Sequence, residues 1–231
     1  MSNNYLLQQK ELVKKLEDSF IDGEHKSTVV DMRKDYVNDD RICLTSVTFI
    51  PNDISSKIIS NVINNLKKIE PYHYFYPFES MHLTIKNIRT ISKPLLFAES
   101  DIIKVDQLFS EIIPKFSIFE VKVEDVLILP SSVSIMVYSD GLQNLNLALD
   151  KGLREIGVPD NKKYLSDLVY WGNITICRFT EKPGNEFNNE VKKMRNFKIG
   201  KFKVEKVNLI TCNAVCYSGS RKIIGGYELI K

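Results

Sequence analysis

Apolar and polar residues alternate along several short stretches of this chain, and elsewhere apolar residues recur three or four positions apart. Alternation predicts half-buried strands, and the wider spacing predicts amphipathic helices. The predicted strands span 42–50, 81–85, 116–129, 132–138, 167–178, 198–213 and 222–230, with a further short strand at 27–32. The predicted helices span 4–21, 53–66, 105–113, 142–156 and 186–196, with Asp53 as the N-cap of the second.

In each half of the chain a strand precedes a helix, and the helix precedes another strand. This order predicts an α+β fold in which two small, mostly antiparallel sheets face each other across a cleft, with helices on the outside and a pseudo-twofold axis between the halves. We expect residues 1–231 to form a single bilobal domain, in which residues 1–40 supply an outer helix and a long connection.

The strand at 81–85 carries a polar row next to an apolar one. Because side chains alternate between the two faces of a strand, His82, Thr84 and Lys86 are predicted to project one way, and Met81, Leu83 and Ile85 the other. A sheet packed on both faces would not keep three polar residues in register, so we expect the polar row to line a cleft. A half-exposed strand with a surface histidine is the alternative that this stretch alone leaves open.

A second stretch of the same form lies 91 residues further along the chain, with Asn173 where a histidine would repeat the pattern and Thr175 two places on. The two stretches predict that each lobe contributes one strand to the cleft. The aromatic stretch at 72–78 leads directly into the first of them. Tyr74 and Tyr76 are candidates for a wall of the cleft, since aromatic faces stack on nucleobases. An aromatic core at the junction of the lobes is the alternative.

Composition narrows the class of protein. Hydrophobic residues make up 43% and charged residues 26% of the chain, which is typical of a globular protein and disfavours disorder. No apolar run reaches the length of a membrane span, and the first twenty residues lack an apolar signal core, so we expect a cytoplasmic protein without a membrane partner. A net charge of +3 neither requires nor excludes nucleic acid, because a phosphate ligand needs only a local basic cleft.

Four scattered cysteines do not predict a disulfide framework. Cys212 and Cys216 have neither a partner pair nor a nearby histidine in the sequence, so we interpret them as strand thiols and predict no metal site.

The paired motifs resemble those of the 2H phosphoesterase superfamily, which includes bacterial 2′-5′ RNA ligases and cyclic phosphodiesterases and is defined by two His-x-Thr/Ser-x motifs on opposed strands. The resemblance extends over most of the chain after Arg41, and the stretch Asn-Ile-Thr-Ile-Cys-Arg-Phe is close to the family form His-x-Thr-Leu-Ala-Arg-Phe. It implies that His82 acts as an acid or base and that Thr84 and Thr175 hold a phosphate. It also implies a 2′,3′-cyclic phosphate end of RNA or a small cyclic nucleotide as ligand, without a metal or nucleotide cofactor.

The departure from the family form is Asn173. A carboxamide donates hydrogen bonds but does not exchange a proton near neutral pH. One of the two groups that would serve as acid and base is therefore missing. The other histidines are His25 and His73, and nothing in the sequence places either opposite His82. Two functions therefore remain open: a phosphoesterase weakened by Asn173, and an inactive module of the same fold that binds an RNA end or a nucleotide. A third interpretation treats the motifs as coincidental.

Three neighbouring positions complete the prediction. Alternation places Lys86 in the cleft and gives Cys177 the parity of Asn173 and Thr175, although a small strand thiol is the favoured interpretation of Cys177. It places Arg178 on the opposite face, where we expect it to anchor the end of the strand.

Overall fold

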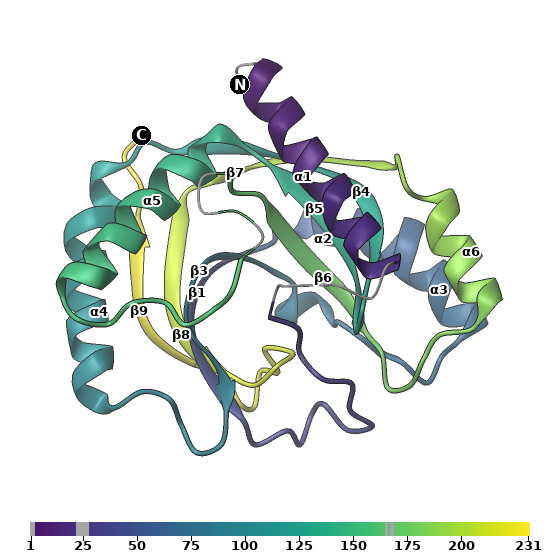
Figure 1. The fold of residues 1–231 in the computed structure, drawn as a ribbon, viewed down its shortest axis with the longest axis horizontal. Coiled ribbons are helices and arrows are strands. Elements are labelled where there is room, and N and C mark those ends of the chain that lie inside the picture. Colours follow the sequence, from purple (N-terminus) through teal and green to yellow (C-terminus); the bar gives the residue numbers. More distant parts are fainter. Residues whose placement is uncertain (1–2, 22–27, 165, 167–168) are drawn as a thin grey trace.

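The computed structural model describes residues 3–21, 28–164, 166 and 169–231. Its strands form two sheets, one of four strands in the order β3-β1-β8-β9 and one of five in the order β2-β6-β5-β4-β7. All strand pairs within them are antiparallel. The predicted α+β fold with two facing sheets is thereby confirmed (Figure 1).

The strands are β1 (Ile42–Phe49), β2 (Tyr74–Phe75), β3 (His82–Ser92), β4 (Phe119–Leu129), β5 (Ser132–Tyr138), β6 (Gly172–Arg178), β7 (Lys198–Val204), β8 (Lys206–Cys212) and β9 (Lys222–Glu228). The helices are α1 (Asn3–Ile21), α2 (Asn52–Ile58), α3 (Asn64–Ile69), α4 (Glu99–Ile112), α5 (Asp140–Glu155) and α6 (Asn185–Lys193). A π-helical segment, Ile59–Ile63, joins α2 to α3, and two short 3₁₀ turns lie at Phe78–Ser80 and Ile113–Lys115.

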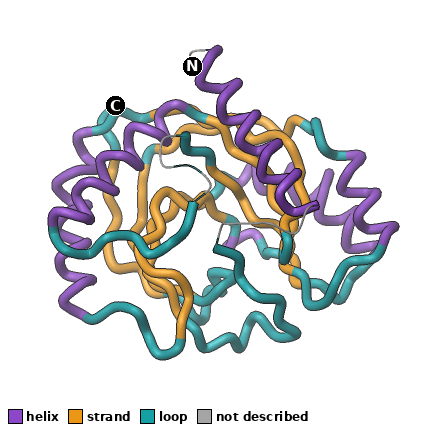
Figure 2. The backbone as a smooth tube through the Cα atoms, in the orientation of Figure 1, coloured by secondary structure: helices purple, strands orange, loops and turns teal. Residues whose placement is uncertain are grey.

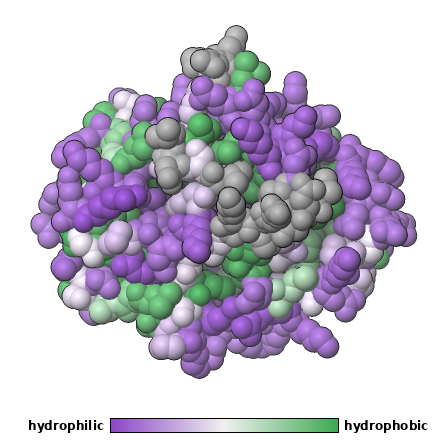
Figure 3. Space-filling view, in the orientation of Figure 1, coloured by the Kyte–Doolittle hydropathy of each residue, from purple (hydrophilic) through white to green (hydrophobic). Residues whose placement is uncertain are grey.

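The helices flank the two sheets on opposite sides of the molecule. In Figure 1, α4 and α5 lie beside the four-stranded sheet, and α2, α3 and α6 lie beside the five-stranded one. These flanks are mostly hydrophilic in Figure 3. Most of the buried apolar residues of both sheets share one core, which includes Leu83 of β3 and Ile174 of β6. Within the described part of the chain, none of the helices combines the length and apolar character that crossing a membrane requires.

The run at 198–213 is divided between the two sheets. β7 pairs with β4 in the five-stranded sheet, and after Glu205 the chain continues as β8, which pairs with β1 in the four-stranded one. No glycine or proline marks this crossing between Val204 and Val207, which is why the sequence alone predicts a single run.

Several predicted boundaries are wrong. Asp53 lies in the first turn of α2, and the N-cap is Pro51. α4 begins at Glu99, six residues before the predicted start, because its first turn is polar and carries no apolar signal. Residues 28–32 contain no strand, and Ser27 lies outside the described residues. The segment from residue 28 to the start of β1 is a long loop instead, as Figure 2 shows.

The N-terminal helix forms over the predicted range, as α1, whereas the start of the second motif strand is wrong. α1 packs on the five-stranded sheet, where buried Val13 belongs to an apolar cluster with Met136 and Tyr138. The strand predicted at 167–178 begins at Gly172; of its predicted first residues, 169–171 form no strand and 167–168 lie outside the described residues.

Candidate functional site

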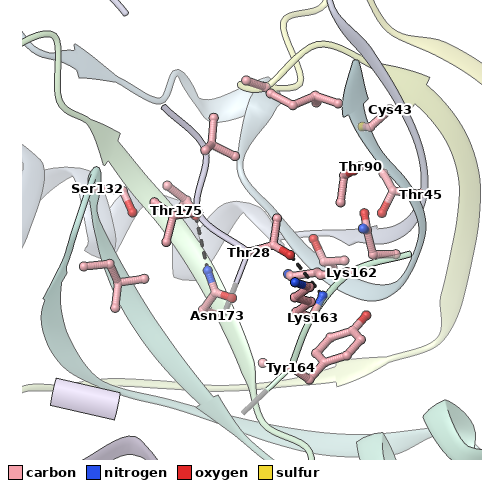
Figure 4. Close-up of a pocket in the computed structure, with 18 of the residues that line it drawn as sticks. Thr28, Cys43, Thr45, Thr90, Ser132, Lys162, Lys163, Tyr164, Asn173 and Thr175 are labelled. Atoms are coloured by element: carbon pink, nitrogen blue, oxygen red, sulfur yellow. Dashed lines mark hydrogen bonds between the residues drawn. The ribbon is translucent and has the colours of Figure 1, made fainter. Parts of the chain in front are cut away.

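A pocket of about 390 Å³ lies between the two sheets. The four residues predicted from the paired motifs all line it: His82 and Thr84 from β3, and Asn173 and Thr175 from β6. Asn173 and Thr175 are labelled in Figure 4. The fold therefore brings together two motifs that are 91 residues apart in sequence. The roles that the resemblance gives to these residues are taken up under the proposed function.

Each motif strand contains a β-bulge just after its threonine. In β3, Thr84 is opposite Val47 and Lys86 is opposite Ser46, so Ile85 is the extra residue. In β6, Thr175 is opposite Ser134 and Cys177 is opposite Val133, so Ile176 is the extra residue. A bulge shifts the alternation of side chains by one position. The same irregularity at matching positions of the two lobes supports their pseudo-twofold relation.

The bulges overturn the predicted directions of Lys86 and Arg178, and they bury Cys177 as a small strand thiol, which was the favoured interpretation of that residue. Lys86 and Cys177 are buried away from the pocket, with exposed fractions of 2% and 0%. Asn87 and Arg178, one residue later in each strand, line the pocket in their place. Simple alternation could not reveal this exchange, because nothing in either stretch marks the isoleucine as an extra residue.

Lys86 instead ties two other segments to β3. Its Nζ lies 2.9 Å from Oδ1 of Asp150 in α5 and 3.0 Å from Oδ2 of Asp160 in the loop that follows. The ammonium group also lies 5.1 Å from the ring centre of Tyr164, within cation–π range. Two carboxylates and an aromatic ring thus surround this buried cation, which gives it a structural role.

His82 is held in a defined orientation at the pocket wall. Its Nδ1 lies 2.8 Å from the carbonyl oxygen of Ser80, and because a carbonyl only accepts, Nδ1 must carry the hydrogen. Burial lowers the pKa of His82, but the adjacent Cys216 thiol and the Ser80 carbonyl outweigh burial, and the pKa is raised above its ordinary value. The imidazole is therefore biased towards its charged form.

Asn173 is fixed against the opposite wall. Its Nδ2 donates to Oγ of Ser134 at 3.3 Å and to Oγ1 of Thr175 at 3.2 Å, and the Ser134 hydroxyl donates to Thr175 at 3.3 Å. The Thr84 hydroxyl, by contrast, has no hydrogen-bond partner among the described residues. Thr84 and the carboxamide oxygen of Asn173 are thus left available to a ligand.

The pocket contains positive charge that the sequence did not reveal. Arg178 and Lys162 line it, and within the described part of the chain neither has a carboxylate at ion-pair distance. The Nε of Arg178 donates to the Tyr76 hydroxyl at 3.4 Å. Burial lowers the pKa of Lys162 and the negative charge of Asp160 raises it, but burial together with the positive charges of Arg178 and Lys86 outweighs Asp160, and the pKa is lowered overall. Unpaired cations in a pocket favour an anionic ligand. Lys162 lies in a polar loop, where no sequence pattern distinguished it.

The remaining sequence candidates lie away from the pocket surface. Tyr74 and Tyr76 do not line it; Tyr76 is 3% exposed and donates its hydroxyl hydrogen to the Ala214 carbonyl at 3.2 Å. His73 is buried beside Glu70, with Nε2 2.8 Å from Oε2, and burial lowers its pKa. His25 lies outside the described residues. A second histidine facing His82 is therefore not found in the described part of the chain. Among these residues, no group of three His, Cys, Asp or Glu side chains is arranged to hold a metal ion.

Comparison with solved structures identifies the fold. The chain matches TT0787 of Thermus thermophilus with a TM-score of 0.57 and 13% identity, over 81% of this chain and 97% of that one. It matches a structure described as a phosphoesterase with a TM-score of 0.57 and 14% identity, over 83% and 100% of the two chains. It matches E. coli LigT, solved in complex with 3'-AMP, with a TM-score of 0.53 and 15% identity, over 83% and 99%.

At these identities the matches show the fold alone, and that fold is the one the 2H phosphoesterase resemblance implied. Neither the models of protein families nor the curated proteins contain a match to this chain.

Proposed function

We propose that this protein is a 2H-type phosphoesterase, similar to RNA ligases and cyclic phosphodiesterases, that acts in the cytoplasm on 2′,3′-cyclic phosphate ends of RNA or on small cyclic nucleotides. Its turnover is weakened by Asn173. The observation that carries the proposal is the convergence of His82, Thr84, Asn173 and Thr175 on one pocket between the sheets.

The size and charge of the pocket support a nucleotide ligand. About 390 Å³ falls within the range of roughly 300–1,000 Å³ that is usual for small-molecule sites. Arg178 and Lys162 supply positive charge next to the two threonines. LigT, which shares the fold, has been solved with 3'-AMP and with ATP, and this supports a nucleotide or RNA end as the ligand class here.

Each residue then has a chemical task. Thr84, whose hydroxyl has no internal partner, donates a hydrogen bond to a nonbridging phosphate oxygen, and Thr175 does the same from the opposite wall. Arg178 balances the phosphate charge. His82, biased towards its charged form, donates a proton to the leaving oxygen. The attacking water is oriented by the free carboxamide oxygen of Asn173, which accepts a hydrogen bond but does not take the proton. The water therefore releases its proton to the solvent as its oxygen bonds to phosphorus and the bond from phosphorus to the leaving oxygen breaks.

The missing base sets the expected activity. Positioned acid or base catalysis typically contributes about 10² to 10⁴-fold, so a site with one histidine should run slower by a factor of that order than the same site with two. The hydrogen bonds that Asn173 makes to Ser134 and Thr175 preserve the shape of the pocket. That observation favours a second candidate function, a module that binds the RNA end or nucleotide without turning it over.

Hydrolysis of a 2′,3′-cyclic nucleotide by excess protein tests the proposal, with wild type, His82→Ala and Asn173→His measured under the same conditions. Turnover by wild type that His82→Ala abolishes and Asn173→His raises would support a weakened enzyme. A silent wild type with an active Asn173→His variant would favour the binding module. If none of the three proteins hydrolyses the cyclic nucleotide, the proposal is overturned for this substrate class.

A further inference from the structure

Three of the four cysteines gather beside His82. Cys43 of β1 and Cys212 of β8 are directly opposite each other in the sheet, with their Sγ atoms 3.7 Å apart. Cys216 lies in the turn after β8, rather than in a strand as the sequence predicted, and it belongs to the same buried apolar cluster. We call Cys43, Cys212 and Cys216 the thiol cluster. All three are buried, with exposed fractions of 8%, 3% and 1%.

Cys216 is held in place by the segment that also orients His82. Its carbonyl oxygen accepts a hydrogen bond from the Ser80 hydroxyl at 3.0 Å, while the Ser80 carbonyl accepts the Nδ1 hydrogen of His82. Cys216 has a φ of 51°, in the left-handed region that residues other than glycine rarely adopt. Its amide donates to the Asn213 carbonyl at 3.1 Å, which closes the turn. The backbone thus fixes this thiol beside the imidazole at some conformational cost.

Positive groups approach the sulfur of Cys216 from two sides. Nη1 of Arg221 lies 3.9 Å from Sγ, and the same nitrogen donates to the Glu79 carbonyl at 2.7 Å. The guanidinium group stacks on Phe49 with its Cζ 4.7 Å from the ring centre, so it is held in that position. The imidazole of His82, which the Ser80 carbonyl orients, also acts on this sulfur and lowers its pKa. A buried sulfur next to two potential cations favours the thiolate form.

We propose that Cys216 is a positioning residue of the pocket: as a thiolate paired with the His82 imidazolium, it keeps His82 charged and oriented near neutral pH. The proton of Cys216 is then carried by His82, and no oxidant or cofactor takes part. His82 presents a fixed cation to an incoming phosphate and holds the proton that the leaving oxygen needs. The catalytic role of this charge pair rests on the proposed function. The pair itself can be tested without any substrate.

The neighbouring groups agree with a single negative charge in the cluster. A hydrogen bond from the Cys212 thiol, together with His82 and Arg221, outweighs burial and lowers the pKa of Cys216 to about 4. The pKa of Cys212 is raised, because its interactions with Cys216 and Cys43 and its burial favour the protonated thiol. The interaction with Cys212 also lowers the pKa of Cys43, but the Cys43 thiol donates its hydrogen to the Cys212 carbonyl at 3.2 Å. That hydrogen bond keeps the proton on Cys43 and leaves Cys216 as the charged member of the cluster.

The other groups around His82 do not supply a negative charge. Tyr76 faces it from the segment before β3, with the two ring centres 6.3 Å apart, and burial raises the pKa of Tyr76 to about 12. Arg178 faces the Tyr76 hydroxyl from β6. Because a tyrosine with such a pKa is neutral at pH 7, the Cys216 sulfur is the group that can hold the imidazole in its charged form.

An NMR titration of the His82 imidazole tests the proposal, with the signal assigned by its loss in His82→Gln. In Cys216→Ser, whose hydroxyl does not ionise in this range, we expect the midpoint of His82 to move to lower pH. The matched control is Cys177→Ala, at a buried cysteine outside the thiol cluster, which should leave the midpoint in place. A midpoint unchanged in Cys216→Ser overturns the proposal.

A reciprocal measurement covers the case in which Cys216→Ser does not fold. The ultraviolet absorbance of the Cys216 thiolate in wild type should persist to acidic pH, and in His82→Gln its midpoint should move to higher pH, because coupling between two groups acts equally on both. An unmoved thiolate midpoint overturns the pair. These titrations also distinguish the failure of the proposed function from the failure of the charge pair. If no cyclic phosphate is hydrolysed but the titration midpoints of His82 and Cys216 still move in the variants, the proposed function is wrong and the charge pair is supported.

Discussion

Leu83 of β3 lies directly over Gly172 of β6. A Cβ atom added to Gly172 would lie 2.4 Å from Cδ1 of Leu83, closer than any real contact of that kind, and also 3.4 Å from Cβ of Val137. Each of the two residues is next to a motif position, because Leu83 follows His82 and Gly172 precedes Asn173. The close approach of the two strands therefore depends on the absence of a side chain at Gly172, and it sets how near the two halves of the site can lie.

Gly172→Ala should destabilise the fold and weaken ligand binding. Forcing a methyl group into a packed core costs about 1–3 kcal/mol, which urea unfolding would measure as a lower midpoint. The double variant with Leu83→Ala identifies the cause. If the two side chains compete for the same space, the combined loss of stability should be smaller than the sum of the two single losses. Additive losses would show that the contact with Leu83 is not what requires glycine here.

The convergence of the two motif strands on one pocket could be predicted from sequence, but the direction of the side chains beyond each threonine could not. His82, Thr84, Asn173 and Thr175 precede the bulges, so simple alternation is valid for them, and all four line the pocket. The bulges at Ile85 and Ile176 depend on pairing with β1 and β5, which are distant in sequence.

Loops and long-range contacts account for the other differences. Lys162 enters the pocket from an irregular loop, where no period exists to indicate a direction. The thiol cluster joins Cys43 to two residues about 170 positions away, and only the pairing of β1 with β8 brings them together. The aromatic stretch at 72–78 was correctly placed next to the first motif strand, and Tyr76 is buried there as core, which was the alternative interpretation.

Arg178→Met should weaken binding of a nucleotide and reduce the dependence of that binding on salt. Arg178 is a pocket cation without a carboxylate partner among the described residues, so its charge is free to act on the phosphate and is screened by added salt. Titration calorimetry with 3'-AMP at two salt concentrations would measure both effects. Cys177→Ala is the control on the same strand, since Cys177 is buried on the opposite face. An equal loss in both variants would indicate damage to β6 rather than loss of a charge.

Thr84→Val and Thr175→Val should each weaken phosphate binding while leaving the fold intact. Each substitution replaces a hydroxyl by a methyl group of similar size, and a hydrogen bond to a charged group contributes about 1.5–3 kcal/mol, or roughly 10-fold to 150-fold in affinity. We expect the larger relative loss at Thr84, because the Thr175 hydroxyl already accepts hydrogen bonds from Asn173 and Ser134. Thr211→Val, on β8 outside the pocket, is the control and should bind as wild type. Wild-type affinity in Thr84→Val would remove this residue from the site.

The buried cation at Lys86 should contribute far more to stability than an exposed one. Its ammonium group is 1% exposed and pairs with Asp150 and Asp160, whose side chains are 20% and 4% exposed. Lys86→Met would leave the buried Asp160 without its cation and Asp150 with Arg154 alone, at an expected cost of about 3–5 kcal/mol. Lys93→Met removes the same charge from an exposed pair with Asp40 and should change stability by about 0–1 kcal/mol. Thermal or urea unfolding would separate the two, and equal losses would contradict the buried pair.

Low pH should destabilise the fold by protonating Asp150, one of the two carboxylates paired with Lys86. Burial raises the pKa of Asp150, but the hydrogen bonds and charges of Lys86 and Arg154 outweigh burial, and the pKa is lowered overall. A carboxyl group whose pKa is lower in the folded state stabilises the fold above its unfolded pKa of about 3.9, and that contribution is lost as the pH falls through the folded value. Wild type should therefore lose stability below about pH 4. Lys86→Met should show a shallower acid dependence, because protonation relieves its uncompensated carboxylates; an unchanged slope would mean that the Asp150 pKa is set by Arg154 alone.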